Sequence, residues 1–377
     1  MKFVLLLLFS LFSSLAFSQE QTPDSPALAA NSYALYDYTS GQFLVEQNAN
    51  AHIPPAHLTK LMTAYVVFGA IKQGKISLSQ RLIPSAYATR IQTDESRMFL
   101  NAGKEVTVEE LLRGLIVQSA NDAARVLAEK IANHELALAD TMNSEAQRLG
   151  LKDTHFVNAT GAPDAQHYSS AHDLALLSAA LVRDFPEFYF IYAQREYQYN
   201  RINQFNRNRL LWQDPFVDGM ATGVNEAEEF YMVASAKRDE RRLIAVVLGT
   251  ATDKLRSSES QRLLNYGFQN FEAIKLYSKT QAVTTKRVWK GTSKHLNIGF
   301  RSDCYITIPK GRGEALKATL ETQQPMLAPI DLGQQIGTLR ITLDDKPYLE
   351  LPVVALDDIR LANVFSRGVD NIRLLFQ

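Results

Sequence analysis

Residues 54–74 carry the stretch that decides the fold, PPAHLTKLMTAYVVFGAIKQG. The two prolines suit the first turn of a helix, and Gly74 suits its end. The segment between them is apolar on nearly every side, although Lys60 lies inside it. A helix without a polar face is predicted to be buried in the middle of its domain. The same apolar surroundings are predicted to desolvate Lys60.

The segments on either side of this helix predict an α+β domain that ends at about residue 275. Helical periodicity dominates the middle of this region, and strand patterns lie towards both of its ends. A sheet built partly from the two ends of the domain is therefore expected. The expected elements are a hairpin over 31–45 with its turn at Ser40-Gly41, helices over 107–148 and 257–271, and strands over 230–235 and 243–248.

Short alternating runs replace this pattern after residue 275. Turn residues such as Pro309-Lys310-Gly311 and Asp344-Asp345-Lys346-Pro347 separate them. This spacing is typical of a small all-β domain of sandwich type, predicted over 276–358. It contains no cluster of residues that indicates catalysis.

The two ends of the chain predict where the protein resides. Residues 1–18 combine Lys2, a short apolar run and small residues before Gln19, which predicts a cleaved secretory signal peptide. The alternative, an uncleaved anchor, requires a longer apolar run. Residues 359–377 place apolar side chains on one helical stripe from Leu361 to Phe376. Such a helix is expected at the outer face of the inner membrane, or else docked on its own domain.

Composition excludes several classes of function. Lysine plus arginine number 40 and aspartate plus glutamate also number 40, so the basic excess of a nucleic-acid-binding protein is missing. Cys304 is the single cysteine, and the seven histidines form no H-x-x-x-H pair on an expected helix. A zinc hydrolase is therefore not expected, and the sequence implies neither a metal nor a cofactor.

Three short elements invite comparison with serine acyl transfer of the S-x-x-K type. Residues 57–60, HLTK, put Lys60 one helical turn after the position where such an enzyme has its serine. Ser119-Ala120-Asn121 fits an S-x-N element, and Ala221-Thr222-Gly223 lies where a K-T-G element would precede a strand. Each element is weak by itself, but their order and spacing together are specific.

On these elements the chain resembles the low-molecular-mass penicillin-binding proteins, which are serine-type D-alanyl-D-alanine carboxypeptidases (peptidase S11-like) of peptidoglycan maturation. The resemblance covers essentially the whole chain. It implies a penicillin-binding-protein/β-lactamase-like transpeptidase domain over 19–275 and the peptidoglycan stem peptide as ligand. Further stretches that carry it are 96–100 (SRMFL), 111–115 (LLRGL), 117–123 (VQSANDA), 158–161 (NATG), 206–212 (NRNRLLW) and 233–236 (VASA).

The resemblance also implies a role for each matching residue. Lys60 would be the general base, Ser119 a proton relay and Asn121 the group that orients the substrate amide. Thr222 and Gly223 would hold the substrate, and the backbone N–H groups of His57 and Val224 would form an oxyanion hole.

The chain departs from the family pattern where the chemistry takes place. His57 stands at the nucleophile position, Ala221 at the K-T-G lysine, and Glu228-Glu229 follow where small residues are usual. Loss of the serine of a catalytic unit costs about 10⁶ in rate, or roughly 8 kcal/mol of barrier. Loss of the lysine removes a charge-assisted hydrogen bond worth about 1.5–3 kcal/mol.

We therefore predict an inactive or severely impaired protein that β-lactams do not acylate and that keeps at most weak binding of the stem peptide. Two alternatives remain: an active D,D-carboxypeptidase with rearranged chemistry, and a structural envelope protein with an unused cleft.

Overall fold

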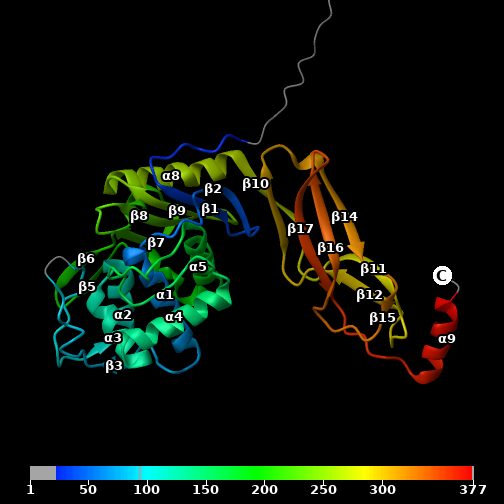
Figure 1. The fold of residues 1–377 in the computed structure, drawn as a ribbon, viewed down its shortest axis with the longest axis horizontal. Helices are drawn as coiled ribbons and strands as arrows, with labels where there is room; N and C mark the ends of the chain where they lie inside the picture. The colour runs from blue at the N-terminus through cyan, green and yellow to red at the C-terminus, as the bar shows by residue number, and fades with distance from the viewer. Residues whose placement is uncertain (1–22, 93–94, 376–377) are drawn as a thin grey trace, which may run out of the picture.

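The computed structural model describes residues 23–92 and 95–375. The predicted signal peptide and the last residues of the predicted terminal stripe lie outside these ranges. The described chain forms an α/β domain, a β domain and a short terminal helix (Figure 1). No helix in the described ranges is long and apolar enough to span a bilayer.

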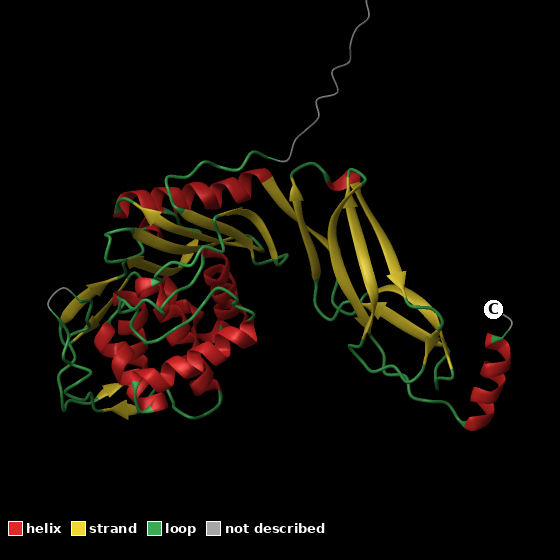
Figure 2. Ribbon diagram, in the orientation of Figure 1, coloured by secondary structure: helices red, strands yellow, loops and turns green. Residues whose placement is uncertain are grey.

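A five-stranded sheet in the order β2-β1-β9-β8-β7 forms the centre of the first domain. Helix α8 covers one face, and the helices around α1 and α5 cover the other (Figures 1 and 2). Both ends of the domain contribute strands, as the sequence predicts. The elements of this domain are β1 (Ser32–Asp37), β2 (Gln42–Gln47), η1 (Ala56–Thr59), α1 (Lys60–Lys72), β3 (Arg81–Leu82), β4 (Val106–Thr107), α2 (Val108–Arg113), η2 (Gly114–Gln118), α3 (Asn121–Ala132), α4 (Glu135–Leu149), α5 (Ala171–Asp184), α6 (Pro186–Tyr189), η3 (Phe190–Ala193), β5 (Glu196–Tyr199), β6 (Ile202–Phe205), α7 (Leu210–Gln213), β7 (Val217–Val224), β8 (Phe230–Arg238), β9 (Arg241–Thr250) and α8 (Asp253–Asn270).

The central helix is buried along almost its whole length, from Lys60 through Phe68. It starts with the 3₁₀ turn η1 rather than as a regular α-helix, so Lys60 is the first residue of α1. The helical region predicted over 107–148 consists of α2, the π-helical turn η2, α3 and α4. The turn at Ser119, whose φ is 59°, ends η2 and lets the chain restart as α3.

The β domain consists of a two-stranded sheet, β10-β13, and a six-stranded sheet, β14-β16-β17-β12-β11-β15. A shared apolar core that includes Ile298, Ile306 and Val353 lies inside it. The sandwich predicted from the sequence is confirmed. Its elements are β10 (Phe271–Tyr277), β11 (Ala282–Trp289), β12 (His295–Gly299), β13 (Cys304–Pro309), η4 (Gly313–Ala315), β14 (Leu316–Thr322), β15 (Met326–Leu327), β16 (Gln335–Leu343) and β17 (Lys346–Ala355).

The two domains are joined at the β1–β2 hairpin by polar contacts to Thr307 of β13. The side-chain amide oxygen of Gln42 accepts from the Thr307 N–H at 2.7 Å, and the Thr307 hydroxyl donates to the buried carboxylate of Asp37 at 2.7 Å. Arg241 donates to the same carboxylate oxygen at 2.8 Å. These contacts fix the β domain against an edge of the first domain.

The terminal helix α9 (Val364–Leu374) is shorter than expected. The prediction that it begins at residue 359 is wrong, because Ile359 and Leu361 form β-bridges with Ile330 and Gly291. The side chain of Asp370 accepts from the Lys290 N–H at 2.7 Å and ties the polar face of the helix to the β domain.

Candidate active site

Lys60 lies at the base of a cleft between α1, the start of α3 and strand β7. Its side chain is 5% exposed, and its Nζ donates to the carbonyl oxygen of Thr160 at 2.8 Å. Burial lowers the pKa of Lys60 to about 7, and the nearby Arg207 acts in the same direction, while Glu95 and Glu135 act in the opposite direction. A lysine in this state can accept a proton near neutral pH.

The loop over 158–161 brings the Thr160 carbonyl to this lysine. The side-chain oxygen of Asn158 accepts from the N–H groups of Thr160 and Gly161 at 3.2 and 2.8 Å, which holds the loop in a tight turn. Gly161 has a φ of +85°, and a Cβ there would lie 1.8 Å from the carbonyl oxygen of Ala56. Glycine is therefore required where this loop meets the start of the helix.

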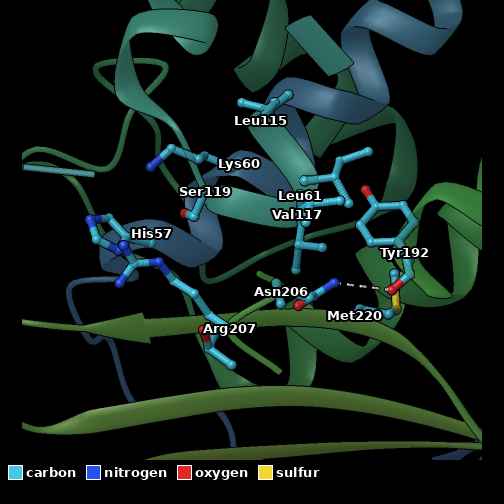
Figure 3. Close-up of a pocket in the computed structure, with 13 residues that line it drawn as sticks. His57, Lys60, Leu61, Leu115, Val117, Ser119, Tyr192, Asn206, Arg207 and Met220 are labelled. Atoms are coloured by element: carbon cyan, nitrogen blue, oxygen red, sulfur yellow. Dashed lines mark hydrogen bonds between the residues drawn. The ribbon is translucent and has the colours of Figure 1, made fainter. Parts of the chain in front are cut away.

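His57 lies in η1, one turn before Lys60, with its half-buried ring at the mouth of the cleft (Figure 3). The charge of Lys60, burial, and the charges of Arg207 and Arg256 together lower the pKa of His57 to about 2. The ring is therefore a neutral imidazole at physiological pH. Among the described residues, no side-chain hydrogen bond of His57 is found.

Ser119 and Asn121 come to the cleft from the junction of η2 and α3. Ser119 faces the same space as Lys60 and His57 (Figure 3). Asn121 is 6% exposed and donates through Nδ2 to the carboxylate of Glu95 at 2.7 Å. The side chain of Asn121 does not cap α3, whose N-cap residue is Ala120.

Strand β7 forms the opposite wall with Ala221, Thr222, Gly223 and Val224. It is an edge strand that pairs with β8 alone, Ala221 opposite Val233. A Cβ at Gly223 would lie 3.5 Å from the backbone nitrogen of His57, so the strand approaches the start of the helix closely.

The pocket between these elements has a volume of about 350 Å³ including its open mouth. It brings five of the residues singled out from the sequence into one space, with Thr222 on the strand side. Asn121 is adjacent to the pocket and does not line it, and neither do Gly223 and Val224. The lining residues are His57, Lys60, Leu61, Leu115, Ile116, Val117, Ser119, Tyr192, Asn206, Arg207, Met220, Ala221 and Thr222.

Two arginines that sequence reasoning did not assign to the site add positive charge to the cleft. Arg207 donates to the carbonyl of Gln118 at 3.2 Å, and Arg256 donates to the carbonyl of Gly223 at 2.9 Å. Burial lowers the pKa of both guanidinium groups. Arg207 lies in the 206–212 stretch that carried the resemblance, which was the available signal for it. Arg256, on α8, had no such signal.

The glutamates after β7 do not face the pocket. Glu229 accepts from Asn31 Nδ2 and from Asn225 Nδ2, each at 2.8 Å, and so closes the turn between β7 and β8. Glu228 is exposed. Neither glutamate lines the pocket, so neither is placed to repel a carboxylate ligand there.

Comparison with known proteins places this architecture in a family. A sequence model described as D-alanyl-D-alanine carboxypeptidase matches residues 19–252, and one described as the C-terminal domain of penicillin-binding protein 5 matches residues 271–360. The chain belongs to the D-alanyl-D-alanine carboxypeptidase family.

Individual relatives within the D-alanyl-D-alanine carboxypeptidase family match over nearly the full chain. The carboxypeptidase DacC of Escherichia coli K12 is 39% identical over 97% of this chain and 93% of its own length. DacA of the same strain is 40% identical over 94% of this chain and 89% of its own length. The crystal structure of penicillin-binding protein 5 from Haemophilus influenzae has a TM-score of 0.85 and 40% identity, and the match covers 89% of this chain and 99% of that one.

Proposed function

We propose that this protein is a catalytically inactive or severely impaired member of the carboxypeptidase family that binds peptidoglycan stem peptides. One observation carries the proposal. Lys60 is held as a base, with its pKa lowered to about 7, but one turn earlier the helix presents the imidazole of His57. Proton abstraction by Lys60 therefore has no hydroxyl to activate at that turn.

The other side chains of the cleft suit binding better than turnover. Arg207 lines the pocket and supplies positive charge for a peptide carboxylate, and Thr222 supplies a hydroxyl on the strand side. Ala221 contributes no charge. We expect weak affinity, because Ala221 cannot make the charge-assisted hydrogen bond that a lysine would make at this position. Such a hydrogen bond would contribute about 1.5–3 kcal/mol.

Labelling with a fluorescent penicillin tests the loss of chemistry. The unmodified protein is expected to form no stable acyl adduct and to release no D-alanine from a pentapeptide. Robust turnover that a β-lactam abolishes would instead establish an active D,D-carboxypeptidase. A Ser119→Ala variant then shows whether the Ser119 hydroxyl has become the nucleophile.

Peptide binding separates the proposal from a purely structural role. Titration of the ¹⁵N-labelled protein with a pentapeptide ending in D-alanyl-D-alanine is expected to shift resonances of residues that line the pocket. If no resonance shifts at millimolar peptide, the result would instead favour a structural envelope protein whose cleft is unused.

We also propose export and peripheral attachment to the outer face of the inner membrane. The signal-peptide pattern of residues 1–18 supports export. Helix α9 supports attachment, because Asp370 on its polar face is tied to the β domain while Phe365 and Leu375 are 88% and 82% exposed. A helix docked to cover its own apolar face would show the opposite exposure.

A further inference from the structure

The contact between Asn121 and Glu95 occupies a hydrogen-bond donor beside the cleft. Asn121 Nδ2 donates to Glu95 Oε2 at 2.7 Å, and the same oxygen lies 3.4 Å from Nη2 of Arg125. A carboxylate acceptor makes this a charge-assisted hydrogen bond, which is stronger than one to a neutral carbonyl. One of the two N–H groups of the Asn121 amide is therefore engaged by the protein itself.

The orientation of the Asn121 amide follows from this contact. If the amide were reversed, Oδ1 would face the carboxylate and the two acceptors would repel each other. Asn121 Oδ1 is buried and has no partner among the described residues. An unpaired buried acceptor is unfavourable, so Oδ1 is expected to accept a hydrogen bond from a ligand that offers a donor, while Nδ2 stays with Glu95.

Two hydrogen bonds of the next residue, Ser96, position the segment that carries Glu95. The N–H of Asn121 donates to the carbonyl of Ser96 at 2.8 Å, and the hydroxyl of Ser96 donates to the carbonyl of Gln118 at 2.6 Å. The segment that carries Glu95 is thus attached to the junction that carries Ser119 and Asn121. Glu95 also acts on Lys60, because its negative charge raises the pKa of that lysine.

We propose that Glu95 is a specificity-determining residue of the cleft, which fixes the orientation of the Asn121 amide and places a negative charge beside its donor group. A ligand whose backbone carbonyl approaches the second N–H of Asn121 Nδ2 lies beside the negative charge of Glu95, which repels it. Acceptor-rich, anionic peptide ends are therefore bound weakly, whereas removal of the carboxylate relieves this repulsion. The inference rests on the proposed binding of stem peptides.

The test compares Glu95→Ala and the isosteric Glu95→Gln with the unmodified chain, using a pentapeptide that ends in D-alanyl-D-alanine as the probe. Glu129→Gln is the matched control, since Glu129 accepts from Ser85 at 2.7 Å and has no contact with Asn121. We expect Glu95→Ala to bind the peptide about tenfold more tightly and Glu129→Gln to bind as the unmodified chain does. Thermal unfolding of each variant checks that it is folded.

A second measurement detects the contact between Asn121 and Glu95 in the absence of ligand. The Asn121 side-chain ¹⁵NH₂ resonances are expected to move in Glu95→Gln and to stay in place in Glu129→Gln; no movement in Glu95→Gln would overturn the inference. Equal peptide affinity of the unmodified chain and Glu95→Ala would also overturn it, while leaving the proposed function intact. Binding by none of the chains would overturn the proposed function, and with it the selectivity assigned to Glu95.

Discussion

The Nζ of Lys60 donates to the carbonyl oxygen of Thr160 at 2.8 Å, although Thr160 lies 100 positions further along the chain. A backbone carbonyl satisfies one ammonium hydrogen without supplying a full negative charge. Lys60 is therefore buried with partial compensation, and the uncharged form of its side chain is favoured.

Stability should depend on pH through Lys60. Its pKa is lowered from 10.5 to about 7 on folding, so the unfolded chain holds more protons between these values and stability rises with pH across that window. Lys60→Met removes this dependence. The free energy of unfolding of Lys60→Met, relative to that of the unmodified chain, should therefore fall by roughly 3 kcal/mol from about pH 6 to about pH 9.5. Chemical denaturation at both values measures the effect, and a difference that is independent of pH would contradict it.

The imidazole of His57 should remain neutral far below the usual range. The charge of Lys60 is the largest cause of its lowered pKa, followed by burial. Ring ¹⁵N shifts recorded from about pH 8 to about pH 4 are expected to show no protonation of His57. In Lys60→Met the pKa of His57 should rise, because its largest perturbing charge has been removed. Titration of His57 near its ordinary pKa of 6.5 in the unmodified chain would show that this electrostatic account is wrong.

Catalysis should return in steps when the family residues are introduced. His57→Ser alone is expected to restore part of the penicillin labelling and D-alanine release, since Lys60 is already in position to accept the proton. Adding Ala221→Lys should restore more, through better binding of the peptide carboxylate. The two substitutions serve one ligand, so their effects should not simply add. No labelling of the folded double variant would mean that more than these two positions prevents catalysis.

Helix α9 should carry membrane attachment. A chain that stops after Ala362 keeps the bridge between Leu361 and Gly291 and loses only the helix, so it should remain folded and appear in the soluble fraction. The double variant Phe365→Ser/Ile372→Ser keeps the helix and loses two exposed apolar side chains, and it should also detach. Retention of the truncated chain on membranes would place the attachment elsewhere.

The domain junction should contribute to stability through Thr307. Thr307→Val preserves shape but removes a donor to the buried carboxylate of Asp37, at an expected cost of about 1–3 kcal/mol. Thr285→Val is the control, because the Thr285 hydroxyl donates to Asn297 at an exposed position. Equal melting temperatures for the two variants would show that Asp37 does not depend on this contact.

Local patterns were sufficient for much of the architecture. The apolar segment after Pro54-Pro55 predicted the buried helix, and alternation with turn residues predicted the β domain. Boundaries were less predictable where tertiary contacts override periodicity. The stripe from Leu361 suggested an early start for α9, but pairing with Gly291 keeps Leu361 extended, and the helix starts only after Asn363.

The sequence by itself determined which chemical groups are present: a lysine one turn after His57, a serine and an asparagine after η2, and an alanine before Thr222-Gly223. The tertiary structure decided what those groups contact. Packing of distant segments brought the Thr160 carbonyl to Lys60, Arg256 to the Gly223 carbonyl, and Glu95 to Asn121. Spacing along a chain cannot reveal such partners, because hydrogen bonds and charges act through space and depend on how the segments fold together.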